Sequence, residues 1–187
     1  MAMYKDVMGT LVRVLAADNI DNSTKQSWQK LIDADLRKGG TVSTLSVRDK
    51  FDYDCCLYAL LHRQLDPAQW DVLVAKYSTH KANKVGAIGR LVARMVSPAP
   101  QLFIYKALTA WAIPKLKGVQ LGKRSTDMIV LPAEFYDMNT WDLAGSPERT
   151  RRNWRGGIHK RLEKLEEQAV IHATEIFDSE QIFVDAA

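Results

Sequence analysis

Cysteine is scarce in this sequence: its 187 residues include two, and these are neighbours, Cys55 and Cys56. Adjacent cysteines rarely bridge each other, and two thiols do not complete a four-ligand zinc site. The four histidines also lack the spacing of a metal-binding motif. A disulfide scaffold and a zinc finger are therefore excluded, we expect neither a metal nor a cofactor, and two buried thiols are the favoured interpretation.

Long hydrophobic runs are absent as well. A bilayer span needs roughly 20 apolar residues, and the most apolar stretch, residues 95–114, is interrupted by Lys106 and by three prolines. Near the amino terminus, charges at Lys5, Asp6 and Arg13 occupy the region where a secretory signal has an uninterrupted apolar segment. We therefore expect no membrane association and a cytoplasmic location.

Acidic residues are missing from the middle of the chain. Residues 72–126 contain ten Lys and Arg and no Asp or Glu, whereas residues 1–71 and 127–187 carry net charges of −1 and −5. One interpretation is a solvated basic face that balances acidic faces elsewhere in the fold. The interpretation that we favour is a surface that faces nucleic-acid phosphates. It predicts DNA contacts from Lys81, Lys84, Lys123 and Arg124.

What the sequence has in abundance is helical spacing. Hydrophobic residues make up 47% of the chain and recur at intervals of three and four, and a length of 187 residues fits about one domain of typical size. The spacing predicts an all-α helical bundle. Its expected helices cover residues 7–15, 22–38, 51–65, 67–77, 85–95, 101–113, 135–144 and 147–176.

The expected buried faces follow from the same spacing. Near the amino terminus the predicted buried stripe consists of Val7, Met8, Leu11, Val12 and Leu15. On the helix over 51–65 it consists of Phe51, Cys55, Tyr58, and Leu61 or His62. Asp66 and Pro67 are a cap and a first helical residue, and they predict the start of the helix whose buried face is Trp70, Leu73, Val74 and Tyr77.

The carboxyl-terminal third has the layout of a helix-turn-helix. A short apolar helix over 135–144 is followed by a turn at Gly145, and a long helix then starts near Glu148 with strongly basic first turns. In this motif the second helix presents its amino-terminal turns to the major groove, where arginine and short polar side chains contact base edges and phosphates. The predicted DNA contacts on this helix are Arg149, Thr150, Arg151, Arg152, Asn153, Arg155 and Lys160.

Two glycines, Gly156 and Gly157, lie inside this long helix. Each costs about 1 kcal/mol relative to alanine in a helix interior. The sequence therefore predicts either a kink at this point or a close approach of the backbone to another element or to DNA.

The segment LDPAQWDVLVAKY, residues 65–77, resembles the opening helix of the region 4 type of helix-turn-helix in sigma factors. Residues 137–165 resemble the other two helices of the same module. The resemblance implies that the residues between them form an insertion that brings basic groups to the DNA. It divides the chain into an N-terminal helical region, 1–64, and a sigma region 4-like DNA-binding module, 65–187, with an insertion at about 78–134.

Over residues 51–77 and 135–168 the sequence resembles the late-gene antitermination proteins Q of lambdoid phages. The resemblance implies a non-enzymatic factor in the host cytoplasm that binds double-stranded DNA at a phage late promoter and engages the bacterial RNA polymerase holoenzyme. Such a factor modifies the polymerase so that it reads through pauses and terminators. A homodimer is compatible with the sequence.

Two alternatives remain at this point. One is another phage DNA-binding protein, such as a repressor or the small subunit of a packaging terminase. The other is a nuclease, for which Asp33 with Asp35, or Asp52 with Asp54, are candidate metal ligands. Because side chains two residues apart on a helix diverge by about 200°, the nuclease is the weaker alternative.

Overall fold

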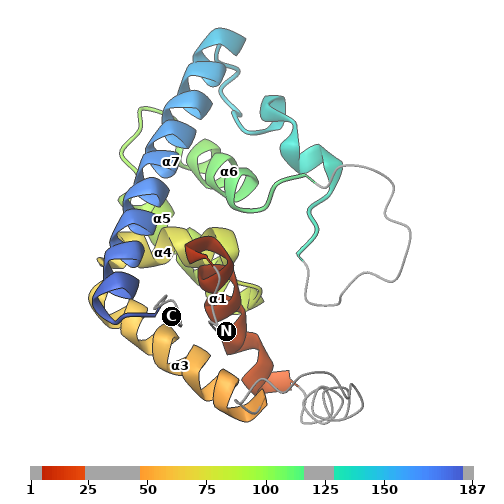
Figure 1. The fold of residues 1–187 in the computed structure, drawn as a ribbon. Helices are drawn as coiled ribbons and strands as arrows, with labels where there is room; N and C mark the ends of the chain where they lie inside the picture. The colour runs from red at the N-terminus through yellow and green to blue at the C-terminus, as the bar shows by residue number, and fades with distance from the viewer. Residues whose placement is uncertain (1–5, 24–46, 116–128, 183–187) are drawn as a thin grey trace. The chain divides into compact units, whose positions relative to one another are not determined.

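The computed structural model describes residues 6–23, 47–115 and 129–182. Within these ranges every regular element is helical, so the all-α prediction is confirmed there (Figure 1). The described residues form two compact units. One comprises residues 1–65 and 170–187, the other residues 66–169, and each is treated by itself below. The predicted division into 1–64 and 65–187 stays a prediction.

The first unit is built on α1 (Val7–Ser23) and α3 (Val47–Gln64), which pack against each other, together with the last turns of α7 (Glu148–Ser179). A salt bridge links α1 to α3, since Arg13 Nε lies 2.8 Å from Oδ2 of the buried Asp54. The core side chains are Leu11, Val14, Leu15, Leu57, Leu61, Leu65, Ala173, Ile176 and Phe177. Asp33, Asp35 and all but the first two residues of the helix expected over 22–38 lie outside the described residues.

The buried faces of α1 and α3 are rotated from those that the sequence predicted. Met8 and Val12 are exposed whereas Val14 is buried, and Cys55 is exposed whereas Leu57 is buried. The prediction of two buried thiols is wrong for the same reason, since Cys56 is exposed too. On α3 an ion pair accounts for the rotation of the buried face. Asp54 is buried where it pairs with Arg13 of α1, and Leu57 and Leu61, three and seven residues further on, lie on the same face of the helix.

The second unit contains α4 (Pro67–Tyr77), α5 (Lys81–Arg94), α6 (Gln101–Ala112) and residues 148–169 of α7. The predicted start of α4 is confirmed: Asp66 is the N-cap residue, and its backbone N–H donates to the Gln69 side chain at 3.2 Å. Trp70, Leu73 and Val74 are buried as predicted. The predicted helices in the basic segment are also confirmed, as α5 and α6.

One element of this unit differs from the prediction. In place of the single helix expected over 135–144, the structure has two 3-10 helices, η1 (Ala133–Tyr136) and η2 (Met138–Thr140), followed by a turn. The indole N–H of the fully buried Trp141 donates to the Phe135 carbonyl at 2.7 Å, and this bond folds the segment back on itself. Leu143, which the helical pattern placed on the buried face, is 88% exposed.

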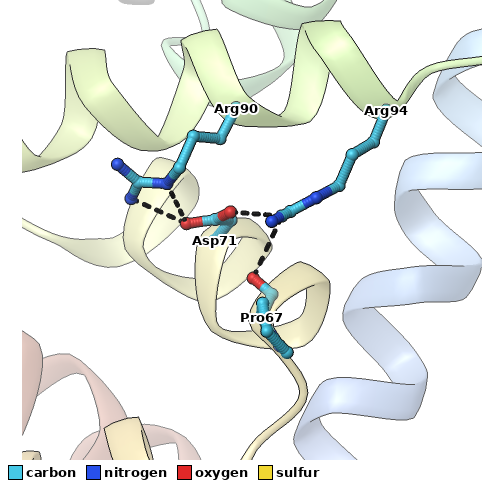
Figure 2. A network of polar contacts seen from close by, with 4 residues as sticks. All are labelled: Pro67, Asp71, Arg90 and Arg94. Carbon is cyan, nitrogen blue, oxygen red and sulfur yellow. Dashed lines mark hydrogen bonds and ion pairs between the residues drawn. The ribbon is translucent and has the colours of Figure 1, made fainter.

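An ion-pair network joins α4 to α5 (Figure 2). The carboxylate of Asp71, 3% exposed, accepts from Arg90 at 2.7 Å and from Arg94 at 2.5 Å. Arg94 also donates to the Pro67 carbonyl at 3.3 Å, in the first turn of α4. Two cations of the basic segment are therefore bound to an acid that lies one residue before the segment begins.

Candidate nucleic-acid interface

A tight turn sets where α7 starts. Asp142 accepts hydrogen bonds from the backbone N–H of Ala144 at 3.0 Å and of Ser146 at 2.7 Å, and Gly145 takes a φ of 70°. That φ lies in the left-handed region, where a side chain is strained, so the predicted glycine turn is confirmed. Hydrogen bonds from Ser146 and Ala144, with the charge of Arg151, lower the pKa of Asp142 and keep it ionised.

The first four turns of α7 present a basic stripe to solvent. Arg149, Asn153, Gly156 and Lys160 are exposed, and their steps of four, three and four residues place them on one side of the helix, with the exposed Arg152 beside them. The other side is packed: Ile158 and Leu162 are buried, and Trp154 meets the Phe103 ring edge-on at 5.5 Å. We call these five residues, Arg149, Arg152, Asn153, Gly156 and Lys160, the basic stripe.

Three other predicted DNA contacts lie nearer the packed side of α7. Thr150 and Arg151 are half-buried, and the Arg151 Nε atom is buried with no hydrogen-bond partner among the described residues. The guanidinium of Arg155 is exposed but lies over the Trp141 ring, 5.7 Å from its centroid. The helix spacing separates these residues from the basic stripe, because Arg155 and Arg151 lie about one and two turns before Ile158, toward the packed side of the helix. Arg151, one of the predicted DNA contacts, is therefore only partly exposed.

A shallow cleft of about 530 Å³ opens beside the basic stripe. Asp137 and Asn139 from the η2 segment line one wall, and Glu148, Arg152 and Gly156 of α7 line the other. Glu148 and Arg152 form a salt bridge with 2.6 Å between Oε1 and Nη2, and their side chains are 60% and 71% exposed.

His159 also lines this cleft, although it is not among the site residues that the sequence predicts. Burial and then the charge of Arg155 lower the pKa of His159, so the imidazole is neutral at pH 7. Its Nε2 atom is buried, with no hydrogen-bond partner among the residues that the structure describes. The local sequence carries no signal for this placement, because it depends on α6 and the η2 segment.

Much of the basic segment faces carboxylates or carbonyls of the protein itself. Besides Arg90 and Arg94, Lys76 lies 2.5 Å from Glu166 of α7 and 4.8 Å from the centroid of the Trp111 ring. Tyr77 donates to the same carboxylate, and Lys106 donates to the Thr140 carbonyl at 3.0 Å. These contacts hold α4, α5 and α6 to their neighbours.

The four predicted DNA contacts of the basic segment have different positions. Lys81 is exposed at the first residue of α5. Lys84 is half-buried, and its amino group donates to the Lys76 carbonyl at 2.9 Å, a bond that a phosphate contact would have to break. Lys123 and Arg124 lie outside the described residues. The structure thus brings Arg149, Arg152, Asn153 and Lys160 together on α7, and leaves Lys84 half-buried with its amino group bonded to the protein's own backbone.

Burial lowers the pKa of Lys84 to about 8, and this predicts a pH dependence of stability. Between the folded pKa and the higher unfolded pKa, the unfolded chain binds more protons, so stability rises as the pH rises through this window. The gain should be on the order of 1 kcal/mol after solvent screening. Urea unfolding between about pH 7.5 and pH 9.5 measures it. Lys84→Met, which has no ionisable amine, should flatten the profile, and an equally steep profile would contradict the assignment.

No helix within the described ranges is long and apolar enough to cross a membrane. Nor do those residues include a group of three or more His, Cys, Asp or Glu arranged to hold a metal ion. Asp54, one of the candidate nuclease ligands, is instead paired with Arg13.

Comparison with known proteins gives no match to a protein-family model, to a curated protein or to a solved structure.

Proposed function

We propose that this protein binds double-stranded DNA through the basic stripe of α7. The observation that carries the proposal is the exposure of Arg149, Arg152, Asn153 and Lys160 on one side of the first four turns of a helix. The helix dipole adds a partial positive charge at the same end. A helix that presents its amino-terminal turns in this way fits the major groove, where arginine and asparagine side chains contact both phosphates and bases.

Gly156 supports a close contact at this surface. A Cβ added at Gly156 would meet nothing within 4 Å in the described structure, so packing within these residues does not require glycine there. Glycine nevertheless lowers helix stability by about 1 kcal/mol relative to alanine. An external surface that approaches the backbone, such as a DNA strand, accounts for a residue without a side chain.

Substituting Gly156 by alanine should therefore change stability and binding in opposite directions. We expect Gly156→Ala to raise the free energy of unfolding by about 1 kcal/mol and to weaken DNA binding several-fold, because the new methyl group keeps the DNA further away. Gly89→Ala on α5 is the matched control, since its Cβ also meets nothing within 4 Å among described residues. It should stabilise the protein and leave DNA affinity unchanged. Urea unfolding and fluorescence anisotropy give the two readouts.

We propose further that the protein is a non-enzymatic phage antitermination factor of the Q type. The support is the resemblance over residues 51–77 and 135–168. In this proposal α4 is the first helix of a sigma region 4-like module, the η1 and η2 segment braces the turn, and α7 is the recognition helix. Residues 78–134 are then an insertion that includes α5 and α6. The partners are late-promoter DNA and the bacterial RNA polymerase holoenzyme.

Transcription with purified polymerase tests this role. Adding the protein to polymerase paused near the late promoter should increase readthrough at a downstream intrinsic terminator. The gain should persist when the DNA ahead of the moving complex lacks the bound element. A variant that lacks Arg149 and Lys160 should lose the effect because it no longer loads on the DNA.

One result of this transcription assay would exclude antitermination. Tight binding to the promoter without added readthrough, across saturating concentrations and with sigma factor present, would exclude antitermination. It would favour a repressor or a terminase small subunit in its place.

A further inference from the structure

Glu148 complements the dipole of α7 at its first residue, but it also places a negative charge on the surface that we propose for DNA binding. It is the first residue of α7, its side chain is 60% exposed, and it is the single carboxylate in the sequence between residues 143 and 162. Next to DNA phosphates a carboxylate is repelled, so it lowers the affinity for any duplex that is held by its backbone alone. An acid in this position therefore suits discrimination between sequences better than it suits overall affinity.

The partner of Glu148 shows how such discrimination can work. Arg152 lies one helical turn further on, and Glu148 Oε1 lies 2.6 Å from Arg152 Nη2. An exposed pair of this kind contributes little to stability. It does place a carboxylate acceptor and a guanidinium donor side by side in the first turns of the helix. Each group retains further capacity, because a carboxylate has a second oxygen and a guanidinium has five N–H donors.

One base pair presents the complementary groups in the major groove. The edge of a C·G pair offers the cytosine N4 amino group, a donor, beside the guanine O6 and N7 acceptors. A carboxylate accepts from cytosine N4, and an arginine donates in bidentate fashion to guanine O6 and N7. A T·A pair presents an acceptor and a methyl group on the pyrimidine side, so it repels the carboxylate.

We propose that the Glu148–Arg152 pair recognises a C·G base pair, with Glu148 as a specificity-determining residue. This rests on the proposed DNA binding and goes beyond it by naming the base pair. Glu148 accepts from cytosine N4, and Arg152 donates to guanine O6 and N7. On other sequences the carboxylate faces a thymine oxygen or a phosphate and opposes binding.

Selection from a random-sequence duplex library with the purified full chain tests the inference. The wild type should select a C·G pair at one position of its site. Glu148→Gln should lose that preference and bind random duplex more tightly, because one negative charge is gone. Arg152→Ala should lose the same preference but bind random duplex more weakly. Replacing the C·G pair by T·A should weaken wild-type binding about tenfold or more, and Glu148→Gln much less.

Glu167→Gln is the matched control. Glu167 is exposed on the same side of α7 but lies five turns from its start, beyond the basic stripe. Its substitution removes the same charge and should leave the selected sequence unchanged. If the wild type binds DNA and Glu148→Gln selects the same bases as the wild type, this inference is overturned while the proposed DNA binding stands. Absence of salt-dependent DNA binding by the wild type would overturn the proposed function and the inference with it.

Discussion

Replacing both Arg90 and Arg94 by alanine is expected to lower the free energy of unfolding by about 3 kcal/mol. The reason is the position of Asp71, whose carboxylate is 3% exposed and accepts from both arginines (Figure 2). Without them a buried negative charge has no cation beside it, and breaking such a pair costs about 3–5 kcal/mol. The lower end of this range applies because the arginines are half-exposed, so water reaches the space that they leave.

Tryptophan fluorescence during urea unfolding measures this change where it occurs. Four of the five tryptophans, Trp70, Trp111, Trp141 and Trp154, lie within residues 66–169, the unit that contains the network. Adding Asp71→Asn to the arginine variant should recover most of the lost stability, because no charge is then left buried. An arginine variant as stable as the wild type, or no recovery with Asp71→Asn, would show that the network does not stabilise α4 against α5.

The second large effect is expected on DNA binding. Substituting Arg149, Arg152 and Lys160 together by alanine should lower DNA affinity about a hundredfold or more, since each phosphate or base contact contributes about 1 kcal/mol or more. The slope of log affinity against log salt concentration should fall by about 0.9 for each phosphate contact that is lost. The three side chains are exposed, so the free energy of unfolding should stay close to that of the wild type.

A control variant separates a specific surface from general attraction. Arg48, Arg63 and Lys115 are also exposed, and their joint replacement by alanine removes the same charge from outside the basic stripe. We expect this control to lose much less affinity and to keep most of the salt slope, since none of the three is among the predicted DNA contacts. Titration of a labelled duplex at several salt concentrations gives both values. Equal losses in the two variants would mean that net charge, and not the basic stripe, drives binding.

Helices that depend on local signals could be predicted closely from the sequence. α4 starts where Asp66 and Pro67 place it, and the long α7 follows the turn at Gly145. The buried positions of α7, such as Ile158 and Leu162, also follow directly from apolar residues at intervals of three and four. In each case the cause lies within one or two turns of chain, so pattern and structure agree.

The candidate site was predicted in part. The sequence identified the basic turns of α7, and Arg149, Arg152, Asn153 and Lys160 are indeed exposed there. It did not separate them from Arg151, which is also an arginine in the same basic turns but lies nearer the packed side of the helix. Only the position of α6 and the η2 segment against α7 makes that distinction.

By itself the sequence determined that the described chain is helical, where α4 and α7 begin, and that one helix carries a basic amino-terminal end. The tertiary structure decided which cations remain at the surface. Lys76 pairs with Glu166, ninety residues further along the chain, and Asp71 binds two arginines of the basic segment. Hydrophobic periodicity is local, whereas an ion pair depends on which helices meet in space, and no pattern within a single segment records that.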